Sequence, residues 1–190
     1  MKPIIKYFVF LSLVLALAAC QTSQSRISNF NAEIGNKYKA ENRTIHMSMG
    51  EKTVQGNTLE IIKGLLAGMG DLNANVSNID KDIGFVTASG RQFISTDVER
   101  RLLQPMLEEW TKGTGIRYIY TPGNYEVTIN FSVYEYDEAN DTSKVKIRIA
   151  QKVDPTAGGA VHEMYPAILR EHYRLVWEVL GKHVFIEAQT

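Results

Sequence analysis

The feature that most constrains the fold is a strict alternation of apolar and polar side chains in residues 125–133. The apolar positions of this segment are Tyr125, Val127, Ile129, Phe131 and Val133. A period of two predicts a β-strand that buries one face and leaves the other in solvent. Antiparallel sheets accommodate such strands, because they can be covered on one side only. The sequence therefore favours an antiparallel sheet with a single layer of helices.

A second alternating segment predicts the partner of this strand. Its apolar positions are Val145, Ile147 and Ile149. Residues 137–142, between the two segments, are mostly polar and suit a hairpin loop. After Val133 the apolar phase shifts, and Tyr134 and Tyr136 become the aromatic positions. Because a shift of one residue exchanges the two faces of a strand, we expect a β-bulge at Val133 and Tyr134.

The polar positions of the return strand form a basic row of Lys144, Lys146 and Arg148. One interpretation is a solvated face whose charges pair with acidic neighbours such as Glu126. The other interpretation is a surface that contacts the phosphates of anionic lipids or of lipopolysaccharide. The sequence leaves both interpretations open.

The remaining patterns predict the other elements. In chain order, we expect a strand at 43–49, a helix at 53–69, strands from 72 and at 85–89, a helix at 96–113 and a helix from Pro166. The last helix carries a broad apolar stripe of Leu169, Tyr173, Val176, Trp177, Leu180 and Val184. Pro105 lacks an amide hydrogen, which predicts a kink or two short helices at 96–113. This order predicts an α+β fold, with helices on one face of an antiparallel sheet and a long C-terminal helix lying across it, helix-grip-like.

The N-terminus has the three parts of a secretory signal. Lys2 and Lys6 supply a positive start, residues 7–17 form an apolar run interrupted only by Ser12, and small residues follow. A transmembrane helix needs about 20 apolar residues, so this run is too short to span a membrane. We therefore assign residues 1–19 to a signal peptide.

The segment Leu17-Ala18-Ala19-Cys20 contains the only cysteine of the chain, and it resembles the lipobox of bacterial lipoproteins. The resemblance implies that diacylglycerol, carrying acyl chains such as palmitate, is attached to Cys20 and that the mature chain begins there. Gln21 in place of aspartate implies the outer membrane. The alternatives are an ordinary signal peptide with an incidental cysteine, or a core cysteine. With no second cysteine, the fold contains no intramolecular disulfide.

Composition limits the number of domains and the kind of partner. The full chain has 21 basic and 21 acidic residues, and residues 1–19 remove two lysines and no acid, which leaves 19 against 21 and a net charge of −2. A balance so near neutrality argues against nucleic acid as the main partner. We expect a polar tether at residues 20–42 and a single periplasmic α+β domain at residues 43–190.

Residues 59–88 carry a second resemblance. An apolar helix at Leu59–Lys63 leads to a strand at Val76, an acidic turn at Asp80–Gly84 and a short apolar strand at Phe85–Ala88. This order resembles the helix–strand–turn–strand unit of BamC-like envelope lipoproteins. The resemblance implies an envelope protein with a helix-grip domain. One such unit is present where that family has two, and a helix is inserted at 96–113, so a role in β-barrel assembly does not follow.

The sequence has no strong catalytic or metal-binding signature. Its histidines are His46, His162, His172 and His183. His162 and Glu163 begin a zinc-helix motif, but Pro166 stands where the second histidine belongs. His172 and His183 are about three helical turns apart, too far to share an ion. We expect no metal, no cofactor and no catalytic residues.

A stripe of three glycines and one glutamate marks the first expected helix. Gly56, Glu60, Gly64 and Gly68 recur every four residues, and at ~100° per residue they lie mostly opposite the apolar face. Each glycine inside a helix costs about 1 kcal/mol relative to alanine. One interpretation is a weak helix held by its apolar face. The other is a docking groove for a neighbouring segment or for a partner, by analogy with membrane helices.

Together these features predict a non-enzymatic outer-membrane lipoprotein that faces the periplasm. We expect an assembly, scaffold or interaction module with an envelope protein as its partner. The alternative is a helix-grip module that binds a lipid or another amphiphile in an apolar cavity. That cavity would be lined by Tyr134, Tyr136, Tyr173 and Trp177.

Overall fold

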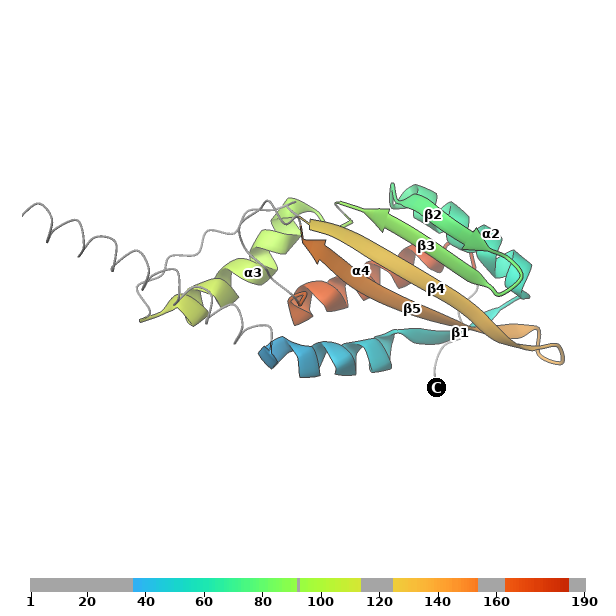
Figure 1. The fold of residues 1–190 in the computed structure, drawn as a ribbon, viewed down its shortest axis with the longest axis horizontal. Coiled ribbons are helices and arrows are strands. Elements are labelled where there is room, and N and C mark those ends of the chain that lie inside the picture. The colour runs from blue at the N-terminus through green and yellow to red at the C-terminus, as the bar shows by residue number, and fades with distance from the viewer. Residues whose placement is uncertain (1–35, 92, 114–124, 154–162, 185–190) are drawn as a thin grey trace, which may run out of the picture.

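A computed structural model describes residues 36–91, 93–113, 125–153 and 163–184 (Figure 1). A helix at residues 36–49 opens the described chain. It is followed by β1 (Glu51–Gln55), α2 (Thr58–Asp71), β2 (Asn75–Asp80), β3 (Phe85–Gly90), α3 (Thr96–Thr111), β4 (Tyr125–Asp137), β5 (Thr142–Val153) and α4 (Pro166–Leu180). Cys20 and His162 lie outside the described residues.

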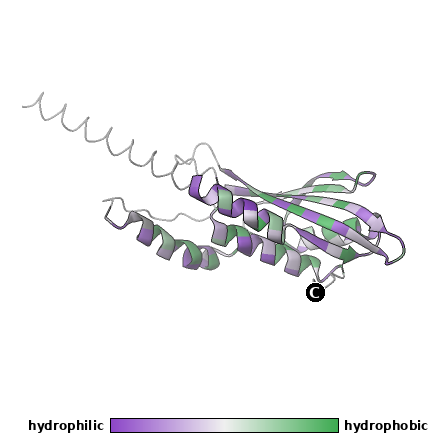
Figure 2. Ribbon diagram, turned by 90° about the horizontal axis from the view of Figure 1, so that it is seen from below, coloured by the Kyte–Doolittle hydropathy of each residue, from purple (hydrophilic) through white to green (hydrophobic). Residues whose placement is uncertain are grey.

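The strands form one antiparallel sheet of five strands in the order β1-β5-β4-β3-β2. The central pair is β4 and β5, in which Ile129 lies opposite Ile149 and Phe131 opposite Ile147. α2 and α4 cover one face of this sheet, and no helix of the described residues lies on the other (Figures 1 and 2). The predicted α+β class and the single helical layer are confirmed. The helix-grip likeness is not confirmed.

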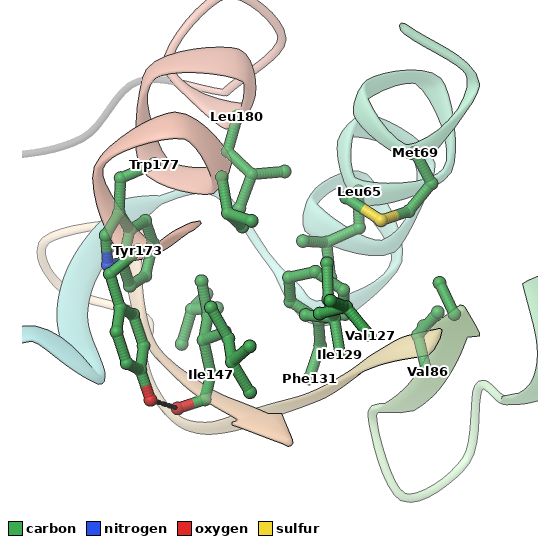
Figure 3. Close-up of a cluster of buried hydrophobic side chains, with 14 of the residues drawn as sticks. Leu65, Met69, Val86, Val127, Ile129, Phe131, Ile147, Tyr173, Trp177 and Leu180 are labelled. Carbon is green, nitrogen blue, oxygen red and sulfur yellow. Dashed lines mark hydrogen bonds between the residues drawn. The ribbon is translucent and has the colours of Figure 1, made fainter. Parts of the chain in front are cut away.

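The core lies between the sheet and the helices α2 and α4 (Figure 3). Val127, Ile129 and Phe131 point from β4 toward this layer and are fully buried. The helices contribute Leu65, Met69, Tyr173, Trp177 and Leu180 from the other side. Burial of each large apolar side chain contributes about 1.5–3 kcal/mol. The alternation in residues 125–133 thus sets which face of the sheet is buried.

The bulge in β4 lies slightly beyond its expected position. The register with β5 shifts between Tyr134 and Asp137, and Glu135 has a positive φ of 50°. Val133 and Tyr134 still pair regularly, with Val145 and Lys144. The hairpin loop is held by Asp137, whose carboxylate accepts hydrogen bonds from the amide of Ala139 at 3.0 Å and the side chain of Asn140 at 2.7 Å.

The expected strand at 43–49 is wrong, because these residues continue a helix that begins before them. Tyr38, Asn42 and Ile45 are buried on one side of it. The first strand is instead β1, and α2 begins only at Thr58. The tether expected at 20–42 is too long at its C-terminal end, since residues 36–42 are helical and belong to the folded domain.

Local sequence explains where the other helices begin. The side chain of Asn57 accepts hydrogen bonds from the amides of Leu59 and Glu60, and Glu60 bonds back to the amide of Asn57, a capping box for α2. Pro166 is in the first turn of α4, where its missing amide hydrogen costs nothing. α3 is one helix that includes Pro105, so the expected division into two short helices is wrong.

Candidate interaction surfaces

Two glycines of α2 contact the end of α4 and the residues that follow it. A Cβ atom on Gly64 would lie 2.2 Å from Cγ1 of Val184, and one on Gly68 would lie 3.1 Å from Cδ2 of Leu180. Both glycines are buried, on the flank of α2 that meets the end of α4. The spacing predicts a stripe mostly opposite the apolar face, yet at Gly64 and Gly68 this side of α2 is buried as well. At Gly64 and Gly68 the docking groove is occupied by a neighbouring segment of this chain.

Gly56 and Glu60 do not belong to that contact. Gly56 precedes α2 with a φ of +111°, and its carbonyl accepts a hydrogen bond from the hydroxyl of Ser143 at 2.9 Å. The carboxylate of Glu60 accepts a hydrogen bond from the amide of Asn57 at 3.1 Å. Gly64 and Gly68 therefore make a close contact within the chain, whereas Gly56 and Glu60 lie at the start of α2. The four residues form no continuous surface for a partner.

The four aromatic residues expected around a cavity point in different directions. Tyr173 is fully buried and donates a hydrogen bond to the carbonyl of Ile147 at 3.1 Å (Figure 3). Trp177 donates from Nε1 to the carbonyl of Met49 at 2.7 Å. Tyr134 and Tyr136 bond elsewhere, to Glu51 at 2.6 Å and to Asp141 at 3.0 Å respectively. These residues do not line a common cavity.

The histidines of the described residues serve in packing and hydrogen bonding. His172 is buried, donates from Nδ1 to the carbonyl of Ile168 at 2.8 Å, and burial lowers its pKa to about 4. His46 Nδ1 lies 2.6 Å from the hydroxyl of Tyr173. Because that hydroxyl already donates to Ile147, Nδ1 of His46 is the protonated nitrogen. Within the described residues, no three groups of the His, Cys, Asp and Glu types are placed to hold a metal ion.

A small groove opens beside α4. Its volume is about 370 Å³, and it is lined by Ser48, Met49, Lys52, Arg174, Trp177 and Glu178. The ammonium of Lys52 lies 5.1 Å from the centroid of the Trp177 ring. The guanidinium of Arg174 bonds to Glu171 at 2.7 Å and to Glu178 at 2.6 Å. The charges that line this groove are thus largely engaged with protein groups, and the groove is open to solvent.

The open face of the sheet carries the predicted basic row. On β5, Lys146 and Arg148 are exposed, and they lie opposite Ser132 and Asn130 of β4. The ammonium of Lys144 lies 2.6 Å from the carboxylate of Glu135, which raises the pKa of Lys144. A solvated face with acidic neighbours therefore describes Lys144, although the partner is Glu135 rather than Glu126.

The helix at residues 36–49 adds a surface that the sequence patterns did not indicate. Its exposed side consists of Asn36, Lys37, Lys39, Ala40, Arg43, Thr44, Met47 and Ser48. Met47 is 76% exposed. A helical wheel drawn over residues 38–49 would have detected it, because Tyr38, Asn42, Ile45 and Met49 follow each other at intervals of four, three and four.

Comparisons with known proteins give little further information. No family model and no curated protein matches this chain. A solved structure described as a conserved protein from Geobacillus kaustophilus is similar over 70% of this chain and 89% of its own, with a TM-score of 0.34 and 13% identity. A likeness this weak carries no argument about function. Among the described residues, no helix has the length and apolar character needed to cross a membrane.

Proposed function

We propose that this protein is a lipid-anchored lipoprotein of the bacterial outer membrane, with its domain in the periplasm. The observation that carries the proposal is the position of Cys20, the only cysteine, directly after a signal-like segment and within Leu-Ala-Ala-Cys. Each acyl methylene that enters the bilayer contributes about 0.8 kcal/mol, and a single chain binds only marginally. The two or three chains of a bacterial lipoprotein would hold the domain stably.

The position of the first described helix supports a role close to the membrane. Sixteen peptide steps separate Cys20 from residue 36. A chain spans at most about 3.3–3.6 Å per residue, so the domain begins within about 58 Å of its anchor. A lipidated Cys20 would therefore confine the domain to a thin layer beneath the membrane.

Within that layer, we propose that the protein acts as an assembly, scaffold or interaction module without catalysis of its own. The supporting observation is the sheet face that α2 and α4 leave uncovered. It presents exposed cations, Lys146 and Arg148, beside the polar side chains of Asn130 and Ser132. Charges arranged in this way set partner choice and association rate more than affinity. The partner that fits is an envelope protein with a complementary acidic surface.

Site-specific photocrosslinking in intact cells tests this module. A photoreactive residue at Ser132, on the open face, should form one adduct with an envelope protein. The same residue at Lys63, exposed on α2, serves as the matched control and should not form it. The adduct should weaken when Lys146→Glu and Arg148→Glu are introduced. Equal adducts from both positions, or none from Ser132, would contradict an interface on the open face.

A further inference from the structure

The helix at residues 36–49 is held firmly by its inner side. The side chain of Asn42 donates to the carbonyl of Met164 at 2.7 Å, and the hydroxyl of Tyr38 donates to the sulfur of Met106 at 3.0 Å. Arg170 reaches Glu41 at 2.8 Å. These contacts join the helix to α3, to α4 and to Met164, which lies two residues before α4. Its outer side is therefore presented in a fixed orientation.

That outer side is basic, with an apolar residue among the charges. Lys37, Lys39 and Arg43 are exposed there, and at ~100° per residue they lie on the same arc of the helix as Met47. The single acidic residue of this helix, Glu41, lies toward Arg170. Methionine is flexible and polarizable, so it adapts readily to an irregular apolar environment. Basic side chains around an exposed apolar one are typical of helices that lie on membranes.

We propose that the outer side of this helix lies on the anionic phospholipid headgroups of the membrane that holds the lipid anchor. The inference rests on the proposed lipidation of Cys20. The helix is the first described element after the anchor, and the intervening residues reach at most about 58 Å. Lys37, Lys39 and Arg43 contact lipid phosphates, and Met47 enters the headgroup layer. The anchor and the helix together fix which side of the domain faces the bilayer.

The size of the electrostatic contribution follows from the number of charges. Each lysine or arginine near an anionic surface strengthens membrane binding about fivefold. Lys39 and Arg43, the two cations that the test removes, therefore contribute about 25-fold. At 0.1 M salt this attraction is screened over distances of ~10 Å. Binding must accordingly weaken as salt is added.

The test uses the mature chain with Cys20→Ser, so that no acyl chain contributes to binding. Sedimentation with vesicles of phosphatidylcholine plus phosphatidylglycerol is compared with pure phosphatidylcholine vesicles. We expect Lys39→Gln with Arg43→Gln to weaken binding to the anionic vesicles about 25-fold. The matched control, Lys63→Gln with Lys81→Gln, removes the same charge from exposed positions on α2 and in the turn after β2. It should bind within about twofold of the parent chain, since Lys63 and Lys81 lie outside the helix at residues 36–49.

The result that overturns the inference is equal binding of both double variants, or binding that is the same with and without phosphatidylglycerol. All four side chains are exposed, so both double variants should unfold at the same temperature as the parent chain. A thermal unfolding measurement verifies that each variant is folded. Palmitate labelling of the wild-type chain in cells separates the two proposals. Labelled Cys20 with no charge-dependent vesicle binding rejects only the helix contact. Charge-dependent binding with unlabelled Cys20 rejects only the lipid anchor.

Discussion

At the scale of single residues, the core uses polar atoms on large side chains to fix its elements. The hydroxyl of Tyr173 is bonded to Ile147, and burial raises its pKa to about 12, so it stays protonated as a donor. Trp177 is 5% exposed and bonds to the carbonyl of Met49. These two donors connect α4 to β5 and to the end of the helix at residues 36–49. The predicted burial of Trp177 is confirmed.

Substitutions at Trp177 separate packing from hydrogen bonding. Trp177→Ala should lower the free energy of unfolding by about 3–5 kcal/mol, because a large buried side chain is lost. Trp177→Phe keeps most of the packing, leaves the Met49 carbonyl without its donor and should cost about 1–3 kcal/mol. Urea denaturation measures both values. A cost below about 1 kcal/mol for the alanine variant, as for an ordinary surface change, would contradict this role.

His172 should make stability depend on pH. Its pKa falls from 6.5 to about 4 because burial disfavours the imidazolium. The unfolded chain therefore binds this proton at a higher pH than the folded chain does. Stability is complete above pH ~6.5 and falls by about 3 kcal/mol as the pH drops to ~4.

His172→Gln provides the comparison for this prediction, because glutamine keeps a donor and does not titrate. Carboxylates such as Glu171 and Asp137, whose pKa values are lowered, titrate in both proteins. The difference between the two pH profiles of unfolding free energy should shrink by about 3 kcal/mol from pH 7 to pH 4. Parallel profiles would show that His172 has the same pKa in the folded and unfolded chains, which contradicts the effect of burial.

At the scale of elements, the close contact of α2 with the residues that follow α4 depends on Gly64. Alanine at Gly64 would bring Cβ to 2.2 Å from Val184 and 3.2 Å from the carbonyl of His183. The resulting repacking should cost about 1–3 kcal/mol, more than the ~1 kcal/mol gained in helix propensity.

Gly70 of the same helix is the matched control for Gly64. A Cβ there would meet nothing within 4 Å, so Gly70→Ala should stabilise the protein by up to about 1 kcal/mol. We expect chemical denaturation to show a lower free energy of unfolding for Gly64→Ala and a higher one for Gly70→Ala. Stabilisation by both substitutions would mean that Val184 does not pack closely against α2 at Gly64.

The elements differ in how well the sequence predicts them, for a physical reason. In β4, only a strand places Val127, Ile129 and Phe131 on one face. In residues 43–49 the same alternation is ambiguous, because Ile45 and Met49 are four apart and share a face in a strand and in a helix alike. Met47 decides between them, and its 76% exposure places it away from the other two, as in a helix.

The candidate sites could be predicted only in part. The spacing of Gly64 and Gly68 indicated a close approach of another segment, but only the fold identifies that segment as the end of α4 and the residues after it. Gly56 and Glu60 matched the spacing, although Glu60 belongs to the helix cap and Gly56 precedes it. The basic row of β5 was visible in the sequence, whereas the basic side of the helix at residues 36–49 became visible only once those residues were seen to be helical.

At the scale of the whole molecule, the sheet has one face under α2 and α4 and one face on which no described helix lies (Figure 2). We propose one role for each exposed region. The lipid on Cys20 would hold the protein in the outer membrane, the outer side of the helix at residues 36–49 would rest on the bilayer, and the open sheet face would bind an envelope protein. The location of the domain at the membrane depends on the modification of one cysteine.

Incorporation of labelled palmitate into this protein in bacterial cells therefore tests the account most directly. The wild-type chain should carry the label and migrate as the processed form that begins at Cys20. Cys20→Ala should carry no label and accumulate as the full-length precursor of 190 residues. Equal labelling of the two proteins, or an unlabelled wild-type chain cut before Cys20, would contradict the lipid anchor and the membrane orientation that follows from it.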